Sequence, residues 1–205
     1  MDDDEIGWFD IDPDHTPSEV QIVFVEALRR RAESWASKIG PGHTLVSPVD
    51  FDQPDLIVAT LDIGDDGRNR GLLDAGVHFD GFTIRCDEVH NQLFTLPDTP
   101  TPLSRVASGA PEELAERAAD WFEWVWDRPV ELHQWLHQGD VYATAYLITD
   151  PKMYLSYSYR DDQAPPGQRD RLIAEGHVHG LGWIQPPGIG TPDQIIHVRG
   201  HVGRG

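Results

Sequence analysis

Cysteine is nearly absent from this 205-residue chain, which has only Cys86. A single thiol excludes a disulfide within the chain and any metal site built from several cysteines. Cys86 stands in the run from Phe82 to Val89, whose composition is typical of a strand. No neighbouring motif marks it as an activated thiol, so we expect it to be a small buried hydrophobic side chain.

Basic residues are also scarce, with 16 Lys and Arg against 35 Asp and Glu and a formal net charge of −19. Nucleic-acid binding depends on Lys and Arg that neutralise phosphates, so this charge argues against unaided binding to DNA or RNA. It argues equally against docking on an anionic membrane. Two interpretations stay open: the charge keeps the protein soluble, or it attracts a partner protein with a basic surface.

Long hydrophobic runs and a cationic leader are missing as well. No stretch approaches the ~20 apolar residues that a transmembrane helix needs. The N-terminal segment Asp2–Asp14 is acidic and lacks the apolar stretch of a secretory signal peptide. We therefore expect a cytoplasmic protein with no membrane partner. The segment 1–15 is expected to be an acidic, mobile arm, with Trp8 and Phe9 as docking side chains in the alternative.

The sequence motifs of several common enzyme classes are absent too. There is no Gly-x-Ser-x-Gly nucleophile elbow, no phosphate-binding loop and no dinucleotide-binding fingerprint. The segment 62–67 resembles a calcium loop, but glycine stands at its third ligand position and Leu73 replaces the terminal glutamate. Enzymatic activity is therefore the less favoured interpretation, and no cofactor is expected.

What the chain does contain is a clear amphipathic helix from Pro111 to Trp126. Proline at its first position needs no amide donor, and Glu112 and Glu113 complement the positive end of the helix dipole. Trp124 is the one apolar residue on the charged side. It is either covered by a neighbouring loop or an exposed anchor for a partner. The predicted apolar arc consists of Leu114, Ala115, Ala118, Ala119, Trp121, Phe122, Val125 and Trp126.

Two segments with period-two alternation, Val130–Gln138 and Val141–Ile148, follow this helix. A two-residue turn at Gln138-Gly139 predicts a hairpin with a fixed register. A third antiparallel strand is expected next, with Met153, Leu155, Tyr157 and Tyr159 sharing one face. On the apolar side of the hairpin, the register predicts the pairs Leu136–Val141, Leu132–Ala145 and Val130–Leu147.

The opposite side of this hairpin is unusually rich in aromatic and histidine side chains. Such residues are costly to leave bare, so a partner, a ligand or another part of the chain is expected to cover them. Together with Trp124 on the helix, this face supplies the predicted binding residues: Glu131, His133, Trp135, His137, Tyr142 and Tyr146.

The pair His133 and His137 has the spacing of a helical zinc site, but Gln134 stands where a zinc protease has its general-base glutamate. In a strand both histidines share a face with Glu131, so another kind of metal site stays open. Acid–base chemistry at this face, with Tyr142 and Tyr146, stays open too. The favoured interpretation is surface or hydrogen-bonded histidines, with no metal and no assigned catalytic residue.

Further elements are predicted on both sides of this central stretch. Thr16 is expected to cap a helix that ends at Gly40, and Asp80-Gly81 to form a hairpin turn. The segment from Pro41 to Pro54 is expected to be a loop and 97–109 a linker. The remaining expectations are a strand at Leu56–Ile63, a short helix at Arg169–Glu175, and edge strands at His177–Ile184 and Ile195–Val198.

These elements predict an α+β fold, in which an antiparallel sheet of hairpins packs against two long amphipathic helices. The acidic arm at 1–15 precedes an α+β domain at 16–160. One interpretation divides this domain into halves at 16–96 and 110–160. A Pro/Gly-rich extension at 161–205 is expected to pack on the domain.

The favoured function is an acidic, non-catalytic, cytoplasmic module that binds another protein, in the manner of bacterial immunity or antitoxin proteins. The charge, the missing motifs and the aromatic–histidine face of the hairpin support it. The alternative is a small enzyme, or a metal- or ligand-binding protein, that uses the same His/Tyr/Trp face of the 130–148 hairpin.

Overall fold

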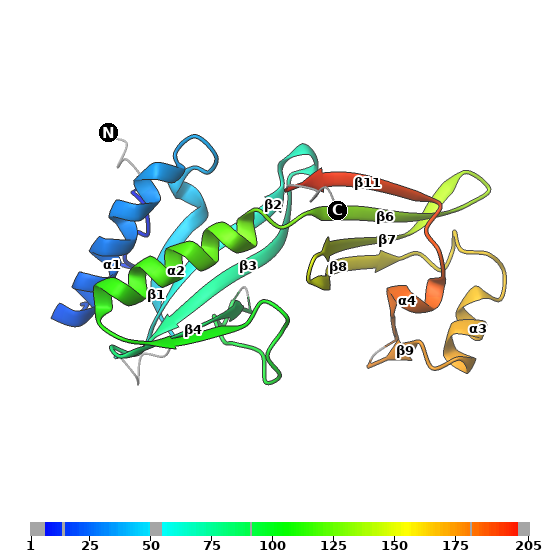
Figure 1. Ribbon diagram of the computed structural model, residues 1–205. Coiled ribbons are helices and arrows are strands. Elements are labelled where there is room, and N and C mark those ends of the chain that lie inside the picture. Colours follow the sequence, from blue (N-terminus) through cyan, green and yellow to red (C-terminus); the bar gives the residue numbers. More distant parts are fainter. Residues whose placement is uncertain (1–6, 14, 50–54, 91, 181, 201–205) are drawn as a thin grey trace. The chain divides into compact units, whose positions relative to one another are not determined.

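The computed structural model describes residues 7–13, 15–49, 55–90, 92–180 and 182–200 (Figure 1). Contacts within the chain group into two compact units, Met1–Trp126 and Asp127–Gly205. The first contains a five-stranded and the second a four-stranded antiparallel sheet, so the predicted α+β class is confirmed. The boundary follows directly after the long predicted helix. The domain limits inferred from the sequence stay a prediction.

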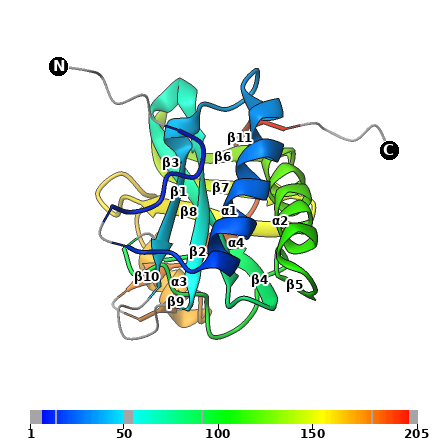
Figure 2. The same ribbon diagram turned by 90° about the vertical axis from the view of Figure 1, so that its left-hand side faces the viewer.

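The sheet of the first unit is an antiparallel meander, because its five strands lie side by side in chain order. Helices α1 and α2 pack together and lie on one side of it (Figure 2). The elements are α1 (Glu19–Ala32), β1 (Thr44–Pro48), β2 (Ile57–Asp65), β3 (Arg70–Phe79), β4 (Thr83–Glu88), β5 (Arg105–Ser108) and α2 (Pro111–Trp126), with 3₁₀ turns at Glu33–Trp35, Pro41–His43 and Asp66–Arg68.

The side of the sheet that faces the helices is built from apolar residues that alternate along the strands. Phe79 of β3 stacks on Phe24 of α1, with the ring centroids 4.2 Å apart. Val77 lies on the same side of β3 and pairs with Cys86 of β4. Cys86 is 1% exposed, and burial raises the pKa of its thiol to about 12. Its predicted role as a small buried hydrophobic side chain is therefore confirmed.

The predicted helix at 111–126 is confirmed at both ends as α2. The first helix differs, because Ser18 and not Thr16 is its cap. The Ser18 hydroxyl accepts the Gln21 amide, and the Gln21 side chain accepts the Ser18 amide at 2.8 Å. This reciprocal pair satisfies two amides that Thr16 cannot reach. The α-helix also ends at Ala32, earlier than the predicted Gly40.

The N-terminal arm is docked over the residues that the structure describes, 7–13. Phe9 is fully buried, and its ring centroid lies 5.6 Å from that of Phe122 and 6.0 Å from that of Trp35. Ile11 forms a parallel bridge with Val46, which extends the sheet beyond β1. Of the two alternatives for this arm, docking through an aromatic side chain is therefore the one observed.

Two strands lie in segments that were expected to be loop or linker. β1 ends at Pro48, where a missing amide donor is tolerated at the end of a strand. β5 lies within 97–109 and pairs with β4 as the last strand of the meander. Its residues are exposed or half-buried, so no hydrophobic alternation marks it in the sequence.

The second unit is built around a four-stranded sheet in the order β11-β6-β7-β8. The predicted helix near 169–175 and the predicted edge strand near 195–198 are confirmed as α3 and β11. The elements are β6 (Val130–His137), β7 (Asp140–Thr149), β8 (Lys152–Tyr159), α3 (Gln168–Ala174), β9 (Val178–His179), β10 (Trp183–Ile184), α4 (Pro186–Ile189) and β11 (Gln194–Arg199).

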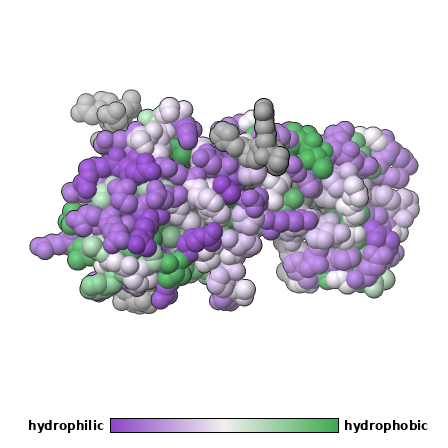
Figure 3. All heavy atoms as spheres, in the orientation of Figure 1, coloured by the Kyte–Doolittle hydropathy of each residue, from purple (hydrophilic) through white to green (hydrophobic). Residues whose placement is uncertain are grey.

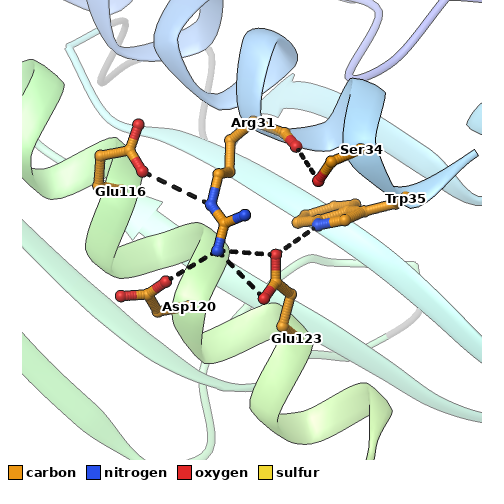
Figure 4. Close-up of polar contacts among 6 residues, drawn as sticks. All are labelled: Arg31, Ser34, Trp35, Glu116, Asp120 and Glu123. Atoms are coloured by element: carbon orange, nitrogen blue, oxygen red, sulfur yellow. Dashed lines mark hydrogen bonds and ion pairs between the residues drawn. The ribbon is translucent and has the colours of Figure 1, made fainter.

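An arginine near the end of α1 joins the two helices of the first unit (Figure 4). The Arg31 guanidinium lies 3.6 Å from Glu116, 3.2 Å from Asp120 and 3.0 Å from Glu123, all on α2. Glu123 also accepts the indole N–H of Trp35 at 2.7 Å. The hydrogen bond to Asp120 is the main cause that raises the pKa of Arg31. One cation therefore neutralises a stripe of acidic residues that repel one another.

Replacing Arg31 with alanine is expected to lower the free energy of unfolding by about 1–2 kcal/mol, because three carboxylates then face each other without a cation. Urea unfolding at low and high salt measures the loss, which salt reduces. Arg117→Ala is the matched control, since it removes only the exposed pair with Glu113, at a cost below about 0.5 kcal/mol. Equal losses for the two variants would contradict a network that joins the helices.

Candidate functional site

The predicted hairpin of the second unit is present, with its turn where the sequence indicates. Gln138 and Gly139 have φ values of +53° and +97°, and His137 pairs with Asp140 on either side of them. Two residues with positive φ form the kind of turn that matches the twist of a hairpin. The predicted pair of Leu136 with Val141 is confirmed.

A bulge directly after this pair changes the rest of the register. Trp135 pairs with Ala143, which leaves Tyr142 as the extra residue of β7. Leu132 then pairs with Tyr146, and Val130 pairs with Ile148. The predicted pairs of Leu132 with Ala145 and of Val130 with Leu147 are therefore wrong.

The bulge also divides the predicted binding face. Glu131, His133 and Trp135 lie on one side of the sheet, whereas Tyr146 lies on the other side, opposite Leu132. The register of β8 shifts in the same way, since Leu147 pairs with Tyr154 and Tyr146 with Ser156. The prediction that alternate residues from Met153 to Tyr159 share one face is wrong for this reason.

On the Trp135 side, the aromatic residues form a core of the second unit. Trp135 is 3% and Tyr142 5% exposed, and the Trp135 indole donates to the Gly190 carbonyl at 3.0 Å. Tyr142 meets Tyr159 edge to face, with ring centroids 5.9 Å apart. The cluster is completed by Ala143, Ala145, Tyr154, Tyr157, Ala164 and Ile189. The cover that this face needs is therefore supplied within the unit, in part by residues after Arg160.

Of the other predicted site residues, Tyr146 is buried, whereas Trp124, Glu131, His133 and His137 are half-buried. His133 lies 3.0 Å from Glu131 in a side-chain contact, and His137 stands at the hairpin end. Trp124 of α2 is covered by Arg105, whose guanidinium carbon lies 4.8 Å from the ring centroid. In the described part of the chain, no three His, Cys, Asp or Glu side chains are arranged to hold a metal ion. The binding role of these residues stays a prediction.

The two units differ in charge, and most of the negative charge lies in the first one. The first unit has 26 acidic and 9 basic residues, and the second has 9 acidic and 7 basic residues. The first unit therefore carries 17 of the 19 net negative charges. Hydrophilic residues dominate the visible surface around α1 and α2 (Figure 3).

The side of the first sheet that faces away from the helices carries a pair of carboxylates. Asp62 of β2 and Asp74 of β3 are directly opposite each other in the register. Both line a cavity of about 480 Å³, together with Leu45, Thr60 and Phe94. A neighbouring pocket of about 230 Å³ also contains Asp62. We take this cavity as the candidate functional site.

The electrostatics of this pair are unfavourable. Burial is the main cause that raises the pKa of both carboxyls, and for Asp74 the charge of Asp62 adds to the effect. The opposing influences come from His43 on Asp62 and from His90 on Asp74. Like charges directly opposite on neighbouring strands also destabilise a sheet. The arrangement is suited to hold a cationic group or a proton between the two carboxylates.

A well-anchored loop brings Phe94 to this cavity. The Nε2 atom of His78 lies 2.6 Å from the Phe94 carbonyl oxygen, and His78 is 8% exposed. Burial is the largest influence on the pKa of His78 and lowers it, which favours the neutral ring. Further along, the Thr101 amide and hydroxyl donate to the buried Asp87 carboxylate. The aromatic wall of the cavity is thus held by two buried polar contacts.

Sequence reasoning did not find this site, although one signal was present. Asp62 stands between Leu61 and Ile63, and Asp74 stands between Leu73 and Ala75, so each carboxylate interrupts an apolar strand. A charged residue in an apolar strand costs stability unless it faces solvent or a ligand. The pairing of the two, however, depends on the register between β2 and β3.

Comparisons with known protein families, curated proteins and solved structures find no match for this chain. No helix in the described part of the chain is long and apolar enough to cross a membrane.

Replacing either Asp62 or Asp74 with asparagine is expected to raise the free energy of unfolding near neutral pH by about 0.5–1 kcal/mol, a value that solvent screening limits. The folded-state pKa values are raised, so the ionised pair costs stability above them. The cost disappears as pH falls below the unfolded value of the carboxyls. The gain should therefore shrink toward about pH 4.

Urea unfolding of each variant at both pH values measures this gain. Glu26→Gln on the exposed side of α1 is the control for charge removal, with a change within about 0.5 kcal/mol. A loss of stability in the asparagine variants would show that the carboxylates hold the sheet together, in contradiction to the electrostatic argument.

Replacing Trp135 with alanine is expected to lower the free energy of unfolding by about 3–5 kcal/mol, because the indole is buried and its N–H is bonded. Trp183→Ala is the matched control, since Trp183 is 58% exposed, and it should cost less than about 1 kcal/mol. Thermal or urea unfolding compares the two. Near-equal values would mean that the Trp135 cluster is not a core.

Proposed function

We propose that this protein is an acidic, non-catalytic, cytoplasmic module that binds a partner protein with a basic surface, in the manner of immunity or antitoxin proteins. The observation that carries the proposal is the concentration of 17 of the 19 net negative charges in the first unit. Even if every basic residue of that unit were paired with one acidic residue, 17 carboxylates would be left over.

Such an excess favours a partner for a physical reason. Carboxylates of one sign repel each other and lower the stability of the compact state, and a basic partner relieves that repulsion. The negative charge also attracts a basic protein over a long range, which raises the rate of association. The same charge repels the phosphates of DNA and RNA. A role in binding proteins therefore agrees with the charge, and a role in binding nucleic acid does not.

The alternative function, a small enzyme or a metal- or ligand-binding protein at the 130–148 hairpin, has less support. Trp135 and Tyr142 are buried within the second unit, and Tyr146 lies on the opposite side of the sheet from them. A substrate at that face would have to reach residues that already pack against one another. No observation favours this alternative over a partner at the acidic unit.

The expected result is a binary complex with a basic protein. The affinity of this protein for that partner should fall at least about tenfold between low salt and about 0.3 M salt. The full-length chain is used to capture partners from an extract of its source cells. Each captured protein is then purified, and its affinity is measured by calorimetry. A partner that is acidic, or that binds with no dependence on salt, would contradict the proposal.

Two sets of charge-neutralising variants show which unit binds this partner. The first set is Glu26→Gln, Glu33→Gln and Glu112→Gln, and the second is Asp140→Asn, Asp162→Asn and Asp170→Asn; all six side chains are exposed. The first set should weaken the complex several-fold more than the second. Equal effects of the two sets would contradict binding at the acidic unit.

A further inference from the structure

We infer that the open side of the first sheet is the docking site of this module, and that an arginine side chain of the basic partner inserts between Asp62 and Asp74. The inference rests on the proposed function and adds to it the site and the residue type that is recognised. It follows from how the sheet is covered, from the charge of the pair and from the shape of the cavity.

Among the described residues of the first unit, helices cover one side of the sheet. α1 and α2 lie on the side of Phe79, and the register puts Asp62 and Asp74 on the other side. The loop that holds Phe94 reaches over part of this other side through the contact with His78. The carboxylates remain accessible, because Asp62 is exposed and Asp74 is half-buried. A partner therefore reaches them without displacing a helix.

The pair has a charge that the chain itself does not balance well. The favourable influences on its ionisation come from the side chains of His43 and His90. A permanent cation placed between the carboxylates would remove their mutual repulsion and favour the ionised form of both. The cost of leaving the pair ionised in the free protein is then recovered when a cation binds.

The shape of the cavity favours a long cationic side chain over a small ion. Its volume is about 480 Å³, and Leu45 and Phe94 give it apolar walls beside the carboxylates. Leu45 is 37% exposed, so its side chain is free to cover the stem of an incoming residue. A metal ion would use only oxygen ligands and would leave these walls without a role.

Arginine fits this cavity better than lysine does. Its planar guanidinium presents five N–H donors in a fixed geometry and bridges two carboxylates, whereas an ammonium group is a compact point charge. The guanidinium also stacks favourably on an aromatic ring such as that of Phe94. The three methylene groups of arginine can then lie against Leu45.

The test uses the full-length protein and two short peptides, hexa-arginine and hexa-lysine, in place of the unidentified partner. Affinities are measured by calorimetry for the wild type, for the pocket variant Asp62→Asn/Asp74→Asn, and for the control Glu26→Gln/Glu33→Gln. The control removes the same charge from α1 and the 3₁₀ turn that follows it. The wild type should prefer the arginine peptide. The pocket variant should lose about tenfold or more in affinity for it, as for one lost charge-assisted contact.

The control should lose only the few-fold that a general decrease in charge causes, and the pocket variant should no longer distinguish arginine from lysine. Amide NMR shifts that follow the arginine peptide should map to Leu45 and Phe94. Equal losses for the pocket variant and the control, or equal affinity of the wild type for both peptides, would overturn the inference. Urea unfolding verifies that the pocket variant is folded, since it is expected to be more stable than the wild type.

The outcome is separable from that of the proposed function. The captured basic protein could bind the pocket variant as tightly as the wild type, and bind the variant with changes at Glu26, Glu33 and Glu112 weakly. This result would support the acidic binding module and contradict the arginine site. If no basic partner exists while the arginine peptide still requires Asp62 and Asp74, the proposed function falls and the cavity remains a guanidinium site.

Discussion

The packing of α1 against α2 on one side of the sheet is the constraint on which the first unit depends. Aromatic rings from three segments meet there, with Phe9 of the arm between Trp35 and Phe122. Arg31 gives the same contact its polar component, because it reaches three acidic residues that recur one turn apart along α2. The apolar contacts supply most of the stability, and the ion pairs fix which faces of the helices meet.

This one-sided arrangement explains why the other side of the sheet is polar. With both helices on the Phe79 side, described loop residues cover part of the opposite side, and two buried contacts, of His78 with Phe94 and of Asp87 with Thr101, anchor them. The remainder carries Asp62 and Asp74 side by side. A sheet that needed only stability would have Thr, Lys or other compatible pairs there, so the acidic pair points to a requirement other than folding.

Local pattern predicted the fold class and several elements, whereas the site depends on features that are not local. The hydrophobic periodicity of residues 111–126 was sufficient to predict α2, and the Gln138-Gly139 pair was sufficient to predict the hairpin turn. The bulge at Tyr142 was not predictable, because one extra residue leaves the sequence alternation unchanged while it moves every residue beyond it to the other face. Asp62 and Asp74 meet only through the pairing of β2 with β3, in which a further register shift occurs near Gly64.

The charges of the two units follow from different physical requirements. The second unit has nearly balanced charge and buries Trp135 and Tyr142 in a core of its own, so its composition is what folding needs. The first unit also has an adequate apolar core, and its excess of carboxylates adds repulsion and no packing. Since repulsion lowers the stability of the free protein, the excess is consistent with the proposed binding of a basic partner. Under this proposal, a basic partner would relieve the repulsion over the whole unit, and a guanidinium would relieve it between Asp62 and Asp74, which lie directly opposite each other on neighbouring strands.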